Sequence, residues 1–471
     1  MGHGSRRMSG LRGAGTGEGR WSQMEIEMSL NEAHAKTLDR LGIRIPEVLL
    51  PKAGTDLSKW AVVACDQYTS DHAYWKAVEE TVGTAPSTLR ITLPEIHLES
   101  PDVAERIGKI HAAMADYRAR DILENQGECL IYVQRTTEHS GTREGLIVAC
   151  DLERYDFARD SKSLFRATEG TIVDRIPPRL AVRREAPLEL PHIMILIDDP
   201  ERAVIEALAS QVAAFSVAYD VELMQKGGQL KGWKLQGEVV GQILSKLETL
   251  LDRTISVQGE QPLFWAMGDG NHSLATAKAR WEETKKELEA AGKPQAEILA
   301  HPARFALAEI VNIHSSGLFF EPIHRAVFTT DVPELTEEVL SEATADVVQT
   351  TEEELQKVLV SPEGQNRLGY FDGKNWYVLN YKGKKLPPAR ADDIYARLAK
   401  SRPGARIDFI HGWEDTRKLT SEGAAVFFTP VIARERLFQW VQENGPLPRK
   451  SFSMGHAEEK RYYMEARQIR I

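Results

Sequence analysis

The stretch AMGDGNHSLATAKA, Ala266 to Ala279, concentrates two glycines, an aspartate, an asparagine and a histidine before it turns into strong helix formers. It continues from the apolar run PLFWAM, Pro262 to Met267, which predicts a short strand. A strand, a glycine corner and a helix in this order leave backbone N–H groups free at the start of the helix, where the helix dipole favours an anion. We therefore predict a corner that binds phosphate.

Several residues of this corner suit such a role. Gly268 and Gly270 can adopt positive φ and leave room for a ligand beside the backbone. Asn271 and Ser273 are both suitable N-caps for the following helix. His272 lies between these two residues and is a candidate to contact a transferred group. These residues form the predicted phosphate site.

Other interpretations of the corner stay open. It matches neither the dinucleotide-binding fingerprint nor the P-loop pattern, so a tight turn that only caps a helix is one alternative. The GNH triplet is similar to the metallophosphoesterases, but their other metal-binding motifs are missing. A single Mg²⁺ held by Asp269 and by substrate phosphates remains compatible. Lys278, further along the helix, could add positive charge near a phosphate.

A second charged segment precedes the corner, from Arg166 to His192. Its arginines Arg175, Arg179 and Arg183 recur every four residues, and guanidinium groups suit bidentate contacts to phosphate. The pair Pro177–Pro178 predicts that they extend from an irregular chain and not from a regular helix. The alternative is a solvated basic face paired with neighbouring carboxylates.

Two carboxylates are candidates for a general base or a Mg²⁺ ligand. Asp66 lies in the polar end of the run Lys59 to Tyr68, which we interpret as a buried strand, and strand ends commonly line binding sites. Glu169 lies in the arginine-rich segment. In contrast, His324 is expected to be a structural histidine, and the C-terminal charge run is expected to form a helix face with Glu and Arg pairs.

Composition limits the class of protein. The 471 residues carry a formal net charge of -10, which disfavours a nucleic acid partner. Three scattered cysteines predict reduced thiols in a cytoplasmic protein. No apolar run is long enough to predict a membrane span. Residues 1–24 are rich in Gly, Arg and Ser and predict a disordered leader.

Helical and strand patterns alternate along the chain, which predicts an α+β or mixed α/β fold with several β-hairpins. We divide it into an N-terminal α/β region (40–160), a central region with the glycine corner (161–330) and a C-terminal α+β region (331–471). Hairpins are expected at ECLIYVQRT with REGLIVACDL, and around Gly227 and Gly228. The acidic stretch from Leu335 to Val360 predicts helix.

Five separated motifs carry a resemblance to a known family: RATEGTI with RIPPR, LELPHI, DGNHS with TA, EPIHR, and GHAEEKRYYMEAR. In this order they resemble the bacterial and archaeal family called domain of unknown function 1015, over residues 40 to 471. Most members have an Asp-Gly-His-His-Arg corner and a His-Glu-x-Thr motif. Here the corner runs from Asp269 to Ser273 without the Arg, and the second motif reads Thr168 to Thr171, which is typical of a divergent subgroup.

The Asp-Gly-x-His corner is also similar to the nucleotide-binding corner of the ParB/sulfiredoxin superfamily, which includes free-serine kinases. This resemblance implies a nucleotide-binding core and a phosphotransferase that acts on a small hydroxylated metabolite, with serine as one candidate. In that hypothesis the corner and Mg²⁺ hold a nucleoside phosphate, the three arginines neutralise developing charge, and Asp66 or Glu169 is the base. The alternative is a regulatory protein that binds nucleotide and hydrolyses it slowly or not at all. A homodimer is compatible with both.

Overall fold

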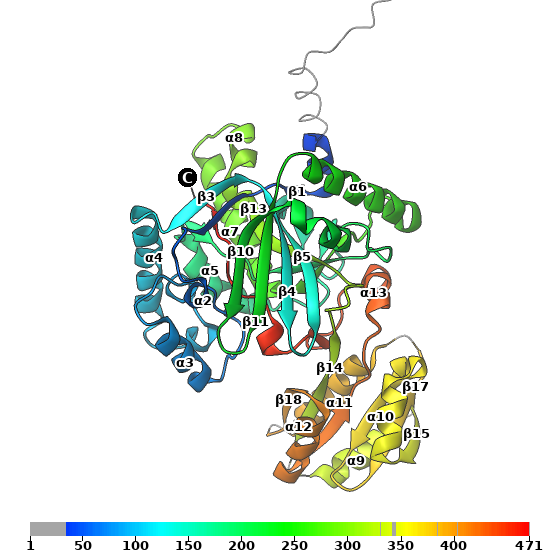
Figure 1. Ribbon diagram of the computed structural model, residues 1–471. Coiled ribbons are helices and arrows are strands. Elements are labelled where there is room, and N and C mark those ends of the chain that lie inside the picture. Colours follow the sequence, from blue (N-terminus) through cyan, green and yellow to red (C-terminus); the bar gives the residue numbers. More distant parts are fainter. Residues whose placement is uncertain (1–33, 330, 342–344, 384, 403, 471) are drawn as a thin grey trace, which may run out of the picture.

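The computed structural model describes residues 34–329, 331–341, 345–383, 385–402 and 404–470 (Figure 1). The predicted leader, residues 1–24, lies outside this part of the chain. Two mixed layers of sheet and helix are present, so the predicted α+β class is confirmed. Within the described residues, no helix has the length and apolar character that a membrane span needs.

The larger sheet contains ten of the described strands, and β1 pairs with β5 outside the main strand order. In spatial order the others are β10 (Ser216–Leu223), β11 (Gly228–Leu235), β4 (Leu130–Thr137), β5 (Gly141–Asp151), β13 (Phe305–Asn312), β9 (Met194–Ile197), β12 (Trp265–Asp269), β7 (Phe165–Arg166) and β6 (Tyr155–Asp156), with β1 at Ile43–Arg44. The predicted hairpins are the antiparallel pairs β4 with β5 and β10 with β11. Strands from both sides of residue 160 join this sheet, and the division into regions at 160 and 330 stays a prediction.

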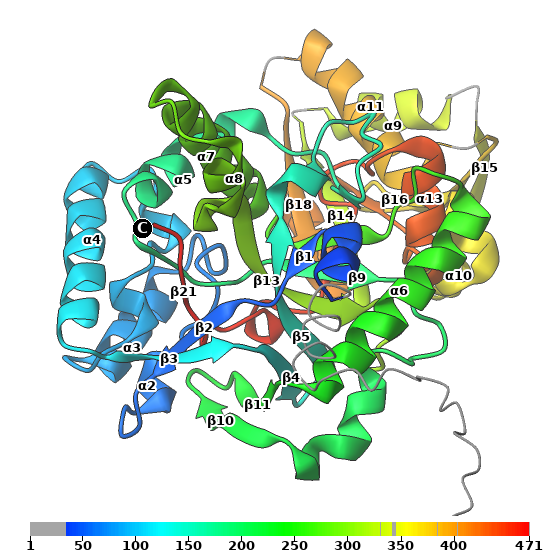
Figure 2. The ribbon, with the colours of Figure 1, turned by 90° about the horizontal axis from the view of Figure 1, so that it is seen from above.

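Both faces of the larger sheet are covered, which explains why β9 is apolar throughout and why most residues of β4, β5 and β13 are buried. On one face, Leu146 and Val148 pack with apolar residues of α6 (Glu238–Gln258) and α7 (Asn271–Ala290). On the other, Ile147 packs in the cluster formed with α3 (His72–Val82) and α4 (Val103–Ala119). Figure 2 shows α4 and α6 on opposite sides of this sheet.

The smaller sheet and its helices form the lower part of the molecule in Figure 1. Its strands, in spatial order, are β15 (Ala345–Thr350), β17 (Trp376–Tyr381), β16 (Arg367–Phe371), β19 (Ala424–Phe428), β14 (Phe320–Phe328) and β18 (Arg406–His411), and β20 (Phe452–Met454) pairs with the start of β14. Helices α9 (Val332–Leu340) and α11 (Pro387–Ser401) pack on one face, and α10 (Glu352–Val360) and α12 (Trp413–Lys418) on the other.

Smaller elements connect these layers. They are the pair β2 (Glu47–Pro51) with β3 (Leu123–Glu128), the pair β8 (Leu188–Glu189) with β21 (Arg467–Gln468), and the helices α2 (Leu57–Trp60), α5 (Ile176–Arg184), α8 (Gln295–Ala300) and α13 (Leu437–Asn444). Helix α13 packs with β9, β12 and the start of β14, so it joins the two sheets.

Three predicted elements are wrong. Lys59 to Tyr68 is no strand, because α2 ends at Trp60 and the next residues are buried against the C-terminal segment, with a single bridge from Val63 to Tyr462. The acidic stretch after Leu335 is interrupted by strand β15. The arginine segment is helical as α5, because its prolines lie in the first turn, where a missing N–H costs no hydrogen bond.

The C-terminal charge run is also not a helix face. It is an extended segment that crosses the larger part of the molecule, where Arg461, Glu465 and Glu309 of β13 are buried. The Arg461 guanidinium contacts both carboxylates, and its Nε donates to the Pro191 carbonyl at 2.8 Å. Burial alone would raise the pKa of Glu309, but Arg461 and Arg143 outweigh it, so that its pKa is lowered.

We expect Arg461→Leu to lower the free energy of unfolding by about 3–5 kcal/mol, because it leaves two buried carboxylates without their partner. Urea unfolding followed by circular dichroism measures this loss. Arg470→Leu is the matched control, since Arg470 pairs with Glu185 at the exposed surface and its loss should cost less than about 1 kcal/mol. Equal stability of the two variants would show that the buried network does not hold the C-terminal segment.

Candidate functional site

The corner at Gly270 is built as the sequence predicts, with two differences, in the N-cap and in the conformation of Gly268. Strand β12 ends at Asp269, Gly270 has φ +79°, and α7 begins at Asn271. A Cβ at Gly270 would lie 3.1 Å from the Cα of Ile193, so glycine is required by both the backbone conformation and the close approach. The N-cap is Gly270 itself and not Asn271 or Ser273, and no side chain caps the helix. Gly268 lacks positive φ.

The first turn of α7 has free backbone donors. The Gly270 N–H donates to its neighbour Asp269 at 2.9 Å, and the Leu274 N–H closes the first helical bond to the Gly270 carbonyl. Within the described chain, the N–H groups of the three intervening residues, Asn271 to Ser273, have no protein acceptor. These donors are what the predicted phosphate site requires, and phosphate binding itself stays a prediction.

The free donors face a cavity of about 470 Å³ between the two sheets. Most predicted site residues line it, namely Asp66, Glu169, Arg175, Arg179, Gly268, Asp269, Gly270, Asn271, His272 and Ser273. The smaller sheet contributes Phe409 and His411 of β18, and the C-terminal segment contributes Arg449, Lys450 and Lys460. The cavity is therefore closed by parts of the chain that are far apart in sequence.

The positive charges in this cavity fall into two groups. Arg179 pairs with Glu95, and Lys460 Nζ lies 3.1 Å from Asp269 Oδ2. The other cations, Arg175, Arg449 and Lys450, form no ion pair with any carboxylate in the described residues. Arg449 lies over the Phe409 ring, with its guanidinium carbon 5.4 Å from the ring centre. Unpaired cations beside free amides favour a polyanionic ligand.

Asp269 is ionised and already has a partner. Burial acts to raise its pKa, but the Lys460 ammonium and the Gly270 N–H outweigh it, and the pKa is lowered. A carboxylate with a low pKa is a weak proton acceptor at neutral pH. Its geometry therefore fits an orienting residue better than a proton acceptor, and its roles as a catalytic residue and a Mg²⁺ ligand stay predictions.

Glu169 differs from Asp269. Its carboxylate accepts hydrogen bonds from the backbone N–H groups of Lys450, at 3.1 Å, and Ser451, at 3.0 Å. Burial raises its pKa to about 7, although these N–H groups and the Lys450 charge act in the opposite direction. A carboxylate that titrates near neutral pH is suited to accept a proton from a substrate hydroxyl.

His272 is a neutral imidazole in a field of cations. Burial, followed by the charges of Arg179, Arg175 and Lys450, lowers its pKa to about 4. Its Nε2 is buried and has no hydrogen-bond partner in the described structure. The same is true of Asn271 Oδ1. Two unsatisfied polar atoms at the start of α7 are consistent with a ligand that completes their hydrogen bonds.

Two predicted residues do not line the main cavity. Lys278 lies two turns along α7, where its Nζ is 2.7 Å from Glu282 Oε1 and donates to the Leu152 carbonyl. Arg183 pairs with Glu189 and lines a neighbouring pocket. Asp66 lies in the cavity, but in a loop and not at a strand end, because the expected strand is absent.

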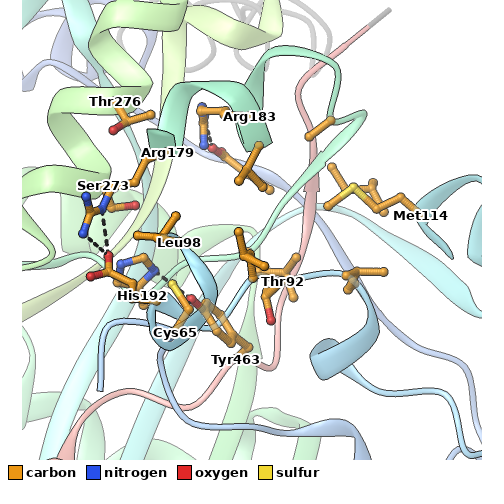
Figure 3. A pocket seen from close by; sticks show the side chains of 18 residues that line it. Cys65, Thr92, Leu98, Met114, Arg179, Arg183, His192, Ser273, Thr276 and Tyr463 are labelled. Carbon is orange, nitrogen blue, oxygen red and sulfur yellow. Dashed lines mark hydrogen bonds and ion pairs between the residues drawn. The ribbon is translucent and has the colours of Figure 1, made fainter. Parts of the chain in front are cut away.

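The neighbouring pocket, of about 130 Å³, shares Glu95, Arg179, His192 and Ser273 with the main cavity. Figure 3 shows Arg179, His192 and Ser273 at one end of this pocket and Met114 at the other. Its remaining lining is largely apolar, including Ile91, Leu93, Leu98, Met114, Val182 and Leu188. Burial raises the pKa of the Cys65 thiol in its wall, so this cysteine is an unreactive thiol. The pocket suits an apolar group attached to an anion in the main cavity.

The sequence interpretation missed the C-terminal contribution to the site. Lys460 lies in the charge run that was expected to form a helix face, Lys450 precedes that run, and His411 lies in strand β18, for which no role was predicted. The pKa of His411 is lowered to about 4 by burial and by the nearby lysines. The adjacent pair Arg449 and Lys450 is the sequence signal that could have indicated an anion-binding segment.

The sequence profile of the family described as "Protein of unknown function (DUF1015)" matches residues 49–401. The chain belongs to this family, and the predicted membership is confirmed. A search of curated proteins found no match.

Similar solved structures include a free serine kinase in complex with AMP, at 11% identity and a TM-score of 0.35, covering 70% of this chain and 93% of that one. SbnI with a C-terminal truncation from Staphylococcus aureus has 9% identity and a TM-score of 0.33, with 66% and 82% covered. A conserved hypothetical protein from Pyrococcus furiosus has 10% identity and a TM-score of 0.33, with 66% and 90% covered. These scores are too low to carry a functional argument, which must come from the residues of this chain.

We expect His272 to stay neutral in the folded protein until the pH falls to about 4. This pKa is below the value of about 6.5 for an unperturbed histidine, so His272 binds a proton more readily in the unfolded chain than in the folded protein. The free energy of unfolding should therefore decrease as the pH falls from about 6.5 to about 4. A pH titration of the ring by NMR measures the pKa. Arg175→Met should raise it, because one repelling charge is removed.

The matched control for this titration is Arg184→Met on the same helix, since Arg184 pairs with Glu283 at the surface. It should leave the pKa of His272 unchanged. A wild-type pKa near 6.5 would contradict the arrangement of cations around this ring.

Proposed function

We propose that this protein is a nucleotide-dependent phosphotransferase that phosphorylates a small hydroxylated metabolite, with a free amino acid such as serine as a candidate. One observation carries the proposal. A single cavity combines the free N–H groups of α7, three unpaired cations and a glutamate that titrates near neutral pH. Its volume of about 470 Å³ is within the range of about 300–1,000 Å³ that is usual for small-molecule sites.

The donor phosphates are assigned to the start of α7. The N–H groups of Asn271 to Ser273 would donate to phosphate oxygens, and Arg175 and Lys450 would supply the opposite charge. The neutral His272 can donate a hydrogen bond to the same group without a change in protonation. The apolar pocket beyond Ser273 would hold an apolar part of one of the two substrates.

The acceptor hydroxyl is assigned to the side of the cavity that holds Glu169. In its ionised form this carboxylate would remove the hydroxyl proton as the oxygen attacks the transferred phosphoryl group. Asp66 and Asp269 are the carboxylates that could hold Mg²⁺ together with the phosphates, and this ion would neutralise charge on the phosphoryl group. Arg179 is kept in place by Glu95 and faces the same cavity.

A second candidate is a regulatory protein that binds nucleotide without transferring phosphate to a metabolite. The ion pair of Asp269 with Lys460 favours it, because a carboxylate held by a lysine is less available to a metal ion. The two candidates share the nucleotide site and differ in the role of Glu169. A homodimer that rearranges on nucleotide binding belongs to this second proposal.

We expect ADP to raise the melting temperature of the protein, and Arg175→Met and Lys450→Met each to weaken ADP binding by about 10- to 100-fold. Isothermal titration calorimetry at constant ionic strength measures the affinities. Lys278→Met is the matched control, because its ammonium is paired with Glu282 outside the cavity and its loss should leave the affinity unchanged. If ADP, ATP and pyrophosphate all fail to bind, both candidate functions are wrong.

We expect Glu169→Gln to retain ADP binding and to lower phosphotransfer by about 100-fold or more. Transfer from ATP and Mg²⁺ to a panel of hydroxy-amino acids and sugars can be followed by ³¹P NMR. For the wild type, the rate should rise as the pH increases through about 7, because only the deprotonated Glu169 accepts a proton. Tight ADP binding without transfer to any acceptor would favour the regulatory protein.

A further inference from the structure

A cluster of two histidines and one glutamate lies outside the cavity. His139 is in the turn between β4 and β5, Glu321 is in β14, and His456 follows β20. One ligand atom from each residue lies within 4.8 Å of the others, and His456 Nε2 is 3.2 Å from Glu321 Oε1. We propose that this cluster, the His139 cluster, binds a divalent transition metal ion such as Zn²⁺.

The donor set determines the type of ion. Two imidazole nitrogens and one carboxylate oxygen match the ligands of zinc sites that keep a fourth position open for water. Mg²⁺ prefers oxygen ligands, so the set discriminates against the ion assigned to the phosphotransfer site. Zinc bonds of about 2.0–2.2 Å place ligand atoms roughly 3.3–3.6 Å apart, which requires a shift of about 1 Å from the present separations. The exposed His139 side chain can make this shift by rotation.

The backbone around the cluster is already fixed by a buried carboxylate. Glu459, 3% exposed, accepts hydrogen bonds from Thr137 Oγ1 at 3.0 Å, from Ser140 Oγ and from the His456 N–H at 2.9 Å. It therefore ties the turn that carries His139 to the segment that carries His456. Strand pairing of Glu321 with Ser453 fixes the third ligand. Binding of a metal would need only side-chain rotation, so little ordering entropy opposes it.

A metal ion in the His139 cluster would connect the two sheets. The turn belongs to the larger sheet, whereas Glu321 lies in a strand of the smaller sheet. Ser453 and Met454, just before His456, line the main cavity. A bound ion would link the two sheets beside the wall of this cavity. The cluster also accounts for EPIHR and GHAEE, the sequence motifs that the phosphotransfer proposal leaves without a role.

Titration of the metal-free, full-length protein with Zn²⁺ tests the proposal. We expect one ion per chain and a rise in melting temperature with Zn²⁺ but not with Mg²⁺ alone. The double variant His139→Ala/His456→Ala should lower the affinity by more than about 100-fold, and Glu321→Gln by at least about 10-fold. Co²⁺ in place of Zn²⁺ should give the visible absorption of a nitrogen- and oxygen-ligated site, and the double variant should lose it.

The matched control is His72→Ala, because His72 is an exposed histidine on α3, remote in sequence from the cluster. It should bind Zn²⁺ as the wild type does. Equal urea midpoints of all variants without metal would show that they are folded. The proposal is overturned if the wild type shows no saturable binding of one ion, or if the double variant binds as tightly as the wild type. ADP binding is measured on the same samples, so failure of this site is distinguishable from failure of the nucleotide site.

Discussion

The buried contacts of Arg461 with Glu309 and Glu465 hold the C-terminal segment against the larger sheet. Tyr462 and Tyr463 follow directly, and their hydroxyl groups contact the Met224 carbonyl and the His192 ring. Because this segment is fixed, Lys460 meets Asp269 at the glycine corner. The position of the Lys460 ammonium in the cavity thus depends on the buried ion pairs of Arg461. Burying these charges costs desolvation energy, which is offset only when each charge has a partner.

Some cations of the cavity are paired with carboxylates and others are not. Lys460 and Arg179 are neutralised by Asp269 and Glu95, and they shape the wall. The unpaired cations lie where the N–H groups of α7 are free. Burial lowers the pKa of His272, and the charges of Arg179, Arg175 and Lys450 lower it further. An anion that enters the cavity would reduce the repulsion among these cations. The charges of this chain alone therefore give a physical reason for affinity toward anions.

Local patterns predicted the elements that depend on local interactions. The hairpin of β4 with β5, and the corner that leads into α7, follow from alternation and from glycine, and both are confirmed. The path of the residues after Arg449 could not be predicted, because their burial depends on Glu309, more than a hundred residues away in sequence. Pro177 and Pro178 disfavour a helix only beyond its first turn, and in α5 both lie within that turn, so the arginines that follow are helical. Lys278 was assigned by proximity in sequence, although two helical turns place its ammonium next to Glu282.

For the proposed phosphotransfer, the unpaired cations have a second effect. Glu169 titrates near neutral pH because burial is opposed by the N–H groups of Lys450 and Ser451 and by the charge of Lys450. A polyphosphate in the cavity brings negative charge toward this carboxylate and acts to raise its pKa, which would leave the base protonated. Lys450 counters this increase, because its positive charge acts to lower the pKa of Glu169. In this proposal Lys450 would both bind the donor and help to keep Glu169 ionised, so donor binding and proton transfer could not be optimised separately.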